Sequence, residues 1–163
     1  MLTLDRLKSV INYNPLTGLF TWMVNTKRIR KGFTAGHIHS SGYVRIAIDG
    51  TIYRAHRLAW FYMTGASPSA HVDHINRIRS DNRWENLRLA TSSQNSCNSS
   101  IRSKNSSGVK GVHWSKQKDK WEAQITVKGE KLFIGSFVDL ELAKLAIDAA
   151  REKFHGTYAS DGL

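Results

Sequence analysis

Residues 72–95 read VDHINRIRSDNRWENLRLATSSQN, and this stretch decides how the first part of the chain folds. An apolar residue, Val72, leads into an Asp-His pair, a pattern typical of a strand that ends at a polar site. A polar loop follows, then a short strand at 87–90, and Thr91 is a suitable N-cap for a helix that carries Asn95. The stretch predicts a strand–loop–strand–helix hairpin, with polar side chains gathered where the first strand meets the helix.

These polar side chains suit phosphodiester chemistry. Asp73 and Asn95 offer oxygen atoms, which bind a hard divalent ion such as Mg²⁺ or Mn²⁺ better than they bind zinc. Such an ion would neutralise a phosphate oxygen and stabilise the leaving 3′ oxygen. His74 is of the residue type suited to taking a proton from water, and Asn86 is placed to brace the loop and hold the His74 ring. Four arginines would hold the phosphate backbone: Arg77, Arg79, Arg83 and Arg88.

The pair Asp73-His74 with Asn86 and Asn95 resembles the HNH endonuclease motif in its Asp-His…Asn…Asn form. Asn86 lies twelve positions after His74, and Asn95 lies nine positions after Asn86. This spacing and the flanking residues resemble phage and intron HNH homing endonucleases, and the resemblance extends over residues 13–98. The upstream pieces that share it are YNPLTGLFTW at 13–22, GYV at 42–44 and AHRLAW at 55–60.

The resemblance implies specific roles for the motif residues. His74 would be the general base, Asp73 and Asn95 would hold one Mg²⁺ or Mn²⁺ per active site, and Asn86 would be the structural asparagine of the catalytic loop. The products would carry 5′-phosphate and 3′-hydroxyl ends. The last motif position is Asn rather than His, a form that also occurs in the family.

A second pattern begins beyond a Ser- and Asn-rich segment at 99–107. Strands are predicted at 109–114, 121–127 and 131–137. A helix is predicted at 140–155, with Asp139 as its N-cap and Gly156 at its end. We expect five residues of this helix to face the sheet: Leu142, Ala146, Ala149, Ala150 and Phe154.

Within this second pattern, residues 106–159 resemble an APETALA-two-type DNA-binding domain. The pieces that carry the resemblance are SGVKGVHW at 107–114, WEAQI at 121–125, FIGSF at 133–137 and ELAKLAID at 141–148. In that family a three-stranded sheet lies in the major groove and a helix backs it. Alternation along the strands predicts that Ala123, Ile125, Val127, Leu132 and Ile134 point towards the helix.

The same resemblance implies that seven residues face DNA: Lys110, His113, Lys116, Gln124, Thr126, Lys131 and Phe133. The plant family has arginines at several of these positions. Lys, His and Thr make fewer bidentate guanine contacts than Arg, so the resemblance implies a looser or different sequence preference.

Charge and composition agree with a nucleic-acid partner. The 163 residues include 24 Lys and Arg against 13 Asp and Glu, a net charge of +11, which favours a polyanionic partner.

Cys97 is the sole cysteine, which excludes an intramolecular disulfide and a cysteine-built zinc site. The start of the chain has no run of signal-peptide length, and the longest apolar run is 58–63. We expect a soluble protein of the cytoplasm, with no membrane partner.

The predicted fold class is α+β. A ββα-metal (HNH) nuclease domain with N-terminal β-hairpin elements at 1–98 would be followed by a linker at 99–107 and a three-stranded antiparallel sheet packed on one helix at 108–163. The predicted function is a metal-dependent DNA endonuclease, a homing-type enzyme that nicks or cuts both strands as a monomer or homodimer. The cell compartment would be the host cytoplasm if a phage encodes it. The alternative is a non-catalytic, sequence-specific DNA-binding transcriptional regulator.

Two features stay open on the sequence alone. His56 precedes a predicted helix at 57–64, where a packing or capping role is favoured over a phosphate contact. The basic stretch at 27–31 is either a solvated loop or a backbone contact. Four tryptophans are expected in the core rather than stacked on bases: Trp22, Trp60, Trp84 and Trp121.

Overall fold

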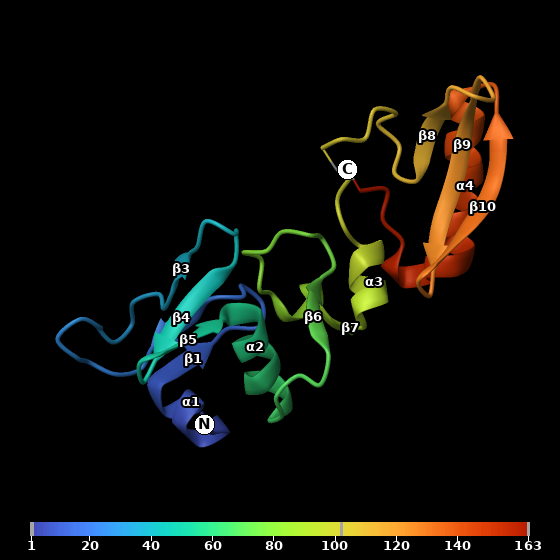
Figure 1. Ribbon diagram of the computed structural model, residues 1–163. Coiled ribbons are helices and arrows are strands. Elements are labelled where there is room, and N and C mark those ends of the chain that lie inside the picture. Colours follow the sequence, from blue (N-terminus) through green and yellow to red (C-terminus); the bar gives the residue numbers. More distant parts are fainter. Residues whose placement is uncertain (1, 102, 163) are drawn as a thin grey trace. The chain divides into compact units, whose positions relative to one another are not determined.

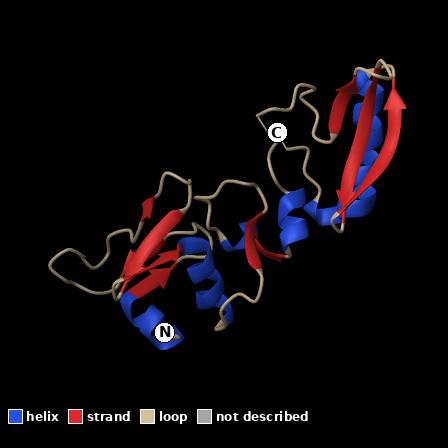
Figure 2. Ribbon diagram, viewed as in Figure 1, coloured by secondary structure: helices blue, strands red, loops and turns tan. Residues whose placement is uncertain are grey.

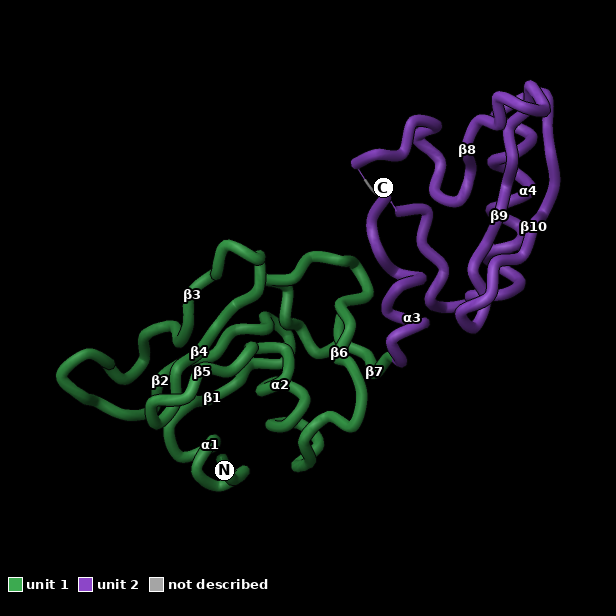
Figure 3. The backbone as a smooth tube through the Cα atoms, in the orientation of Figure 1, with its two compact units in different colours: residues 1–90 green, residues 91–163 purple. Residues whose placement is uncertain are grey.

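A computed structural model describes residues 2–101 and 103–162 of the chain, which forms two compact units (Figures 1 and 3). Unit 1 spans residues 1–90 and unit 2 spans 91–163. Both consist of helices and small antiparallel sheets (Figure 2). The two units are defined by how the chain packs. The functional domains and the linker at 99–107 that the sequence suggests remain a prediction. Arg102 of that segment lies outside the described residues.

Unit 1 contains three small sheets and two α-helices. In chain order its elements are α1 (Leu4–Val10), β1 (Ile11–Tyr13), β2 (Phe20–Trp22), β3 (His37–Ile38), β4 (Val44–Ile48), β5 (Thr51–Arg54), α2 (Ala55–Thr64), β6 (His71–His74), the 3₁₀ turn η1 (Trp84–Asn86) and β7 (Leu87–Ala90). The strands pair as β1–β2, as β3–β4–β5 and as β6–β7, and every pair is antiparallel.

Local sequence signals explain most of these elements. Asp49 and Gly50 both have positive φ, which closes the β4–β5 hairpin with the twist that short hairpins require. Gly65 ends α2 in the left-handed conformation. The Thr3 side chain caps the first helix, which ends at Val10 because Ile11 already belongs to β1.

A single core holds unit 1 together and fixes the base of β6 and β7. Leu7, Ile11, Phe20 and Ile46 are almost completely buried in it, at 0–2% exposure. Val72 of β6 and other residues from every part of the unit complete the same cluster. The hairpin that carries Asp73 and His74 therefore rests on packing that spans the whole unit.

Unit 2 is a three-stranded sheet covered by one long helix, preceded by a short helix. Its elements are α3 (Ser92–Cys97), β8 (Val112–Ser115), β9 (Lys120–Val127), β10 (Glu130–Phe137), α4 (Leu140–His155) and the 3₁₀ turn η2 (Gly156–Tyr158). The strand order is β10–β9–β8. Asp139 caps α4 and Gly156 follows it, as the sequence predicts. Among the described helices none is long and apolar enough to cross a membrane.

The predicted inner face of α4 was wrong by about one residue. Ala143, Ile147 and Ala150 are buried against the sheet, whereas Leu142 is 51% exposed and Phe154 40% exposed. Of the five predicted contacts, Ala150 alone is buried. The helix offers two apolar stripes, and the smaller Ala143 and Ala150 side chains let its backbone lie close to the sheet.

The predicted alternation along β9 was right. Ala123 and Ile125 are buried and Val127 packs against the same core. Ile134 packs there too, and Leu132 lies opposite Ile125 but remains 42% exposed.

Candidate active site

The β6–β7 hairpin places Asp73 and His74 at the end of a buried strand. In the ladder Asp73 lies opposite Arg88, and His74 lies opposite Leu87. The loop between the strands folds back on itself, since the Ile75 amide donates to the Asn86 carbonyl at 2.9 Å. Asp73 is 7% exposed and His74 is 4% exposed, so both polar groups are held inside the unit.

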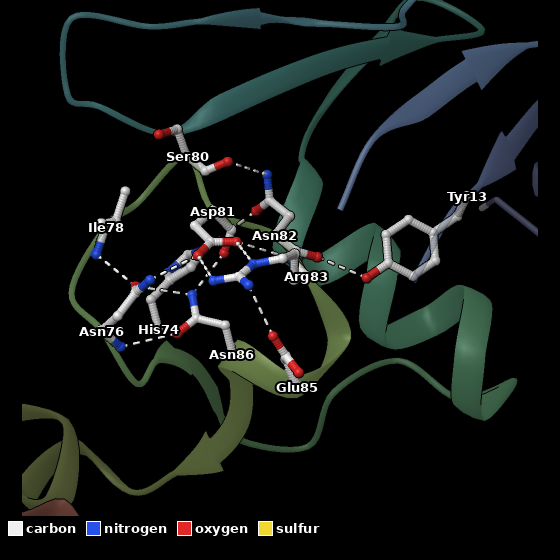
Figure 4. Close-up of polar contacts among 10 residues, drawn as sticks. All are labelled: Tyr13, His74, Asn76, Ile78, Ser80, Asp81, Asn82, Arg83, Glu85 and Asn86. Carbon is white, nitrogen blue, oxygen red and sulfur yellow. Dashed lines mark hydrogen bonds and ion pairs between the residues drawn. The ribbon is translucent and has the colours of Figure 1, made fainter. Parts of the chain in front are cut away.

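Asn82 contacts the His74 ring. His74 Nε2 lies 3.3 Å from Asn82 Oδ1, and Asn82 Nδ2 donates to the Ser80 carbonyl at 3.1 Å (Figure 4). Because Nδ2 is committed to Ser80, the amide oxygen faces the ring and Nε2 must carry the hydrogen. This fixes the tautomer in which Nδ1 has the lone pair that accepts a proton.

The β1–β2 hairpin, the first of the chain, supports the backbone segment around Asn82. The Tyr13 hydroxyl donates to the Asn82 carbonyl at 2.7 Å (Figure 4), and the Trp84 amide donates to the Pro15 carbonyl at 2.9 Å. A Cβ on Gly18 would lie 2.4 Å from the Arg83 nitrogen, so the backbones are in direct contact there. The role of Asn82 was missed from sequence, where it appeared only as a flanking residue of the motif.

Asn86 braces the loop. Its Oδ1 accepts from the Asn76 amide at 2.9 Å, and its Nδ2 donates to Asn76 Oδ1 and to the Asp81 carbonyl (Figure 4). The bracing predicted for Asn86 is therefore what its side chain does. Asn82 contacts the His74 ring, and a contact of Asn86 with that ring remains a prediction.

Asp73 forms a buried ion pair with Arg88. Arg88 Nε and Nη2 each lie 2.9 Å from Asp73 Oδ2, with side-chain exposures of 16% and 8% for Arg88 and Asp73. The guanidinium fixes the orientation of the carboxylate, as charged neighbours of metal ligands commonly do. A phosphate contact by Arg88 remains a prediction.

The other predicted phosphate arginines differ in what they contact. Arg83 pairs with Asp81 and Glu85, and this guanidinium holds the pKa of Asp81 down at about 2. Arg79 donates to the Ser41 carbonyl, and the Arg77 amide donates to the His74 carbonyl. Of these, Arg79 is exposed and carries no carboxylate partner among the residues that the structure describes.

A buried aromatic cluster surrounds His74. The His56 ring lies 4.9 Å from the His74 ring and 5.1 Å from the Tyr43 ring. Burial, with the nearby His74, Arg54 and Arg57, lowers the pKa of His56 to about 3. Burial also lowers the pKa of His74, although the Asn82 hydrogen bond acts in the opposite direction. Both rings are therefore neutral at pH 7, which is the form that a general base needs.

Asn95 lies on α3, in unit 2. Thr91 begins this helix with a complete capping box, in which its hydroxyl accepts from the Gln94 amide and the Gln94 side chain accepts from the Thr91 amide. Asn95 is exposed, and a shared site with Asp73 remains a prediction. Within 2–101 and 103–162, no three His, Cys, Asp or Glu side chains are gathered as a metal site. A metal here would need amide, water or phosphate oxygens beside Asp73, a donor set that suits Mg²⁺ or Mn²⁺.

The outer face of the unit 2 sheet brings together five of the seven residues predicted to face DNA. Thr126 lies opposite Lys131, and Gln124 lies opposite Phe133. His113 lies opposite Glu122, an acidic residue at the centre of this face that pairs with Lys118 at 2.7 Å.

The remaining two residues of that set lie elsewhere. Lys116 is exposed in the β8–β9 turn. Lys110 precedes β8, and its ammonium donates to the carbonyl oxygens of Cys97 and Ser99 at 2.6 Å each.

Comparison with known proteins gives three matches. Residues 53–97 match the sequence model of the HNH endonuclease family. Protein 3.8 of Escherichia phage T7 is 33% identical over 107 residues, which cover 65% of this chain and 88% of that protein. A solved structure of DNA binding and cleavage by the HNH homing endonuclease I-HmuI matches with a TM-score of 0.41 and 24% identity, over 55% of this chain and about half (51%) of that one.

Proposed function

The chain belongs to the family of phage T7 protein 3.8 and carries an HNH endonuclease domain, and from this premise we propose that it is a divalent-metal-dependent DNA endonuclease. The observation that carries the proposal is the His74–Asn82 contact beside Asp73. A neutral, buried histidine whose tautomer is fixed stands next to a carboxylate, both at the end of one strand. This is the arrangement needed to activate water against a phosphodiester.

In the proposed reaction His74 Nδ1 takes a proton from the attacking water. Asn82 holds the ring in the required tautomer, and Asn86 keeps the loop folded around it. Exclusion of bulk water from His74 keeps the ring neutral and strengthens its hydrogen bonds. The oxygen that attacks phosphorus becomes part of the 5′-phosphate, and the 3′ oxygen leaves.

Asp73 and Asn95 would hold the divalent ion, which supplies charge neutralisation at the phosphate and at the leaving oxygen when it is bound. Arg88 orients Asp73 for that role. Mg²⁺ sites of this kind use one or two carboxylates together with substrate phosphates.

Unit 2 would hold the DNA duplex through the outer face of its sheet, in the manner of the APETALA-two-type domain that it resembles. The exposed groups at Thr126, Lys131 and Phe133 offer a hydroxyl, a cation and an aromatic surface side by side. One active site per chain cuts one strand, so a monomer would nick and two chains would be needed for a double-strand break. A homing-type role in a phage-infected cell follows from the resemblance and is part of this proposal.

A plasmid assay tests the function. Wild-type protein should convert supercoiled plasmid to the nicked form in Mg²⁺ or Mn²⁺ and should leave it intact in EDTA. His74→Ala should lower the cleavage rate by about a hundredfold or more, the usual contribution of a general base. His71→Ala, at an exposed histidine of the same strand, is the matched control and should cleave normally.

The proposal fails if the wild-type protein leaves the plasmid intact in both ions, or if His74→Ala cleaves as fast as the wild type. Tight DNA binding without turnover in either ion would instead support the alternative of a non-catalytic regulator.

A further inference from the structure

The outward face of the β3–β4–β5 sheet carries a row of basic side chains. His37 lies opposite Arg45 in the β3–β4 ladder, and Arg45 lies opposite Arg54 in the β4–β5 ladder. Ile46 and Ile48 point the other way and are buried in the core. The three residues therefore form one line across the sheet on the side away from the core.

The two arginines of this row face each other without a counter-ion. Like charges directly opposite in an antiparallel pair destabilise a sheet. Among the described residues neither guanidinium has a carboxylate partner within 4 Å. Between residues 6 and 72 the sequence has one acidic residue, Asp49, and its carboxylate forms an ion pair with Arg6 at 2.8 Å. Nothing nearby in this stretch of sequence offsets the repulsion.

Tyr43 connects this row to His74. The Arg54 guanidinium lies 4.8 Å from the centre of the Tyr43 ring and the Arg79 guanidinium lies 5.1 Å from it. The same ring is 6.0 Å from the His74 ring. Cation–π contacts hold the two guanidinium groups in place without using their N–H groups, and Arg79 donates one of its N–H groups to the Ser41 carbonyl. The row thus begins beside the proposed general base.

We propose that this face, built around Arg45 and Arg54, binds the phosphate backbone of DNA next to the bond that His74 attacks. The inference rests on the proposed function, since it takes DNA as the substrate. A polyanion is the partner that fits, because it would replace the missing counter-ions along a line of cations. Guanidinium groups bind phosphate oxygens bidentately, so the contact positions the backbone and reads no bases.

The Arg45→Gln/Arg54→Gln variant tests this face. DNA affinity should be measured in EDTA over a series of salt concentrations, on the full-length protein carrying His74→Ala so that no cleavage occurs. Loss of two phosphate contacts should lower the slope of log K against log salt by about 1.8 and weaken binding by roughly 50-fold at 0.1 M salt. The Tm should hold or rise, because the repulsion between the two arginines is removed.

The matched control is Lys8→Gln/Lys144→Gln, which removes two exposed charges far in sequence from the row. Its salt slope should equal that of the parent protein. Should the arginine double variant fail to fold, Arg45→Gln alone decides the matter through an expected slope loss of about 0.9. An unchanged slope in the arginine variant, or an equal loss in the control, overturns the inference. Because binding is measured without metal or turnover, this result is independent of whether the plasmid assay shows cleavage.

Discussion

Asn82 sets the tautomer of His74, the proposed general base, although it makes no proposed contact with substrate. Replacing it with Leu keeps the volume but removes the acceptor for His74 Nε2, so the ring loses its tautomer and a buried donor loses its partner. We expect Asn82→Leu to lower kcat by roughly tenfold to a hundredfold. DNA affinity in EDTA should be unchanged.

A partial rescue separates positioning from general damage to the fold. Asn82→Asp retains an acceptor oxygen and should recover part of the lost kcat, while losing the hydrogen bond to Ser80. If Asn82→Leu and Asn82→Asp lose kcat equally, or if KM changes and kcat does not, the positioning role is excluded.

His56 makes stability depend on pH. In the unfolded chain it takes up a proton near pH 6.5, whereas in the folded chain its pKa is about 3. Between these values the unfolded state binds more protons, so the free energy of unfolding falls as the pH drops below 6.5. From this group alone the loss at pH 5 is on the order of 2 kcal/mol.

Urea unfolding at pH 7 and pH 5 measures this effect. His56→Phe should lose less stability between the two pH values than the wild type, and His37→Phe, at an exposed position, should behave as the wild type. Equal pH dependence in His56→Phe and the wild type would show that His56 is not the group responsible. The dependence that remains would come from His74, whose pKa is also lowered by burial.

At the residue scale, the sequence points to the residues proposed for the chemistry more directly than to the residues that hold them in place. Asp73 and His74 are recognisable because they follow an apolar strand at a motif spacing. Asn82 is not, because its position depends on Tyr13 and Pro15, which are remote in sequence. The Arg88–Asp73 ion pair depends on how β6 and β7 are aligned, and no local sequence pattern predicts that alignment.

Among the elements, the first β-hairpin acts as a support for the loop that contacts His74. Gly18 has φ of +71°, and a Cβ there would lie 2.4 Å from the Arg83 nitrogen and 2.5 Å from the Asn82 carbonyl carbon. Gly18→Ala should therefore displace the segment that holds His74. We expect lower thermal stability, by about 1–3 kcal/mol beyond the backbone strain, together with a lower kcat.

Gly50→Ala is the matched control, since Gly50 has φ of +78° but nothing within 4 Å of the added Cβ. Gly50→Ala has the free-energy cost of placing Ala in the left-handed conformation, but its Cβ collides with no neighbouring atom. Gly18→Ala should have a clearly lower thermal stability and a clearly lower rate of plasmid cleavage than Gly50→Ala. Similar losses in the two variants would mean that the hairpin does not support the loop.

The capping box of α3 offers a test of the predicted role of Asn95. A six-residue helix depends heavily on its cap, and replacing Thr91 with Ala costs about 1 kcal/mol. We expect Thr91→Ala to raise the Mn²⁺ concentration needed for half-maximal cleavage severalfold, with unchanged DNA binding in EDTA. Ser93→Ala, at an exposed position of the same helix, should leave the requirement unchanged. An unaltered Mn²⁺ requirement in Thr91→Ala would argue against a metal ligand on α3.

At the element scale, prediction succeeds where the signal is local and fails where two packings compete. The Asp139 cap and the Gly156 end of α4 each depend on a few adjacent residues, and both are found as predicted. In α4, the stripe through Leu142 and the stripe through Ile147 are both apolar. The choice between them depends on the shape of the sheet surface, which the helix sequence does not contain.

For the whole molecule, the net charge of +11 is divided between two units with separate cores, so DNA contacts in unit 2 can be changed apart from the chemistry proposed for unit 1. If unit 2 docks DNA through its outer sheet face, reversing a charge there should weaken binding without affecting the chemical step. Lys131→Glu should raise KM for duplex DNA about tenfold while kcat at saturating DNA stays within twofold. Steady-state cleavage kinetics give both values.

Lys144→Glu, on the exposed side of α4, makes the same change in net charge away from that face. Charges further from the phosphates than about 10 Å are largely screened at 0.1 M salt, so this variant should change KM much less. Equal effects of the two variants would mean that net charge alone governs binding and that the sheet face has no special part in it. A fall in kcat with unchanged KM would place Lys131 in the chemistry and contradict the division between the units.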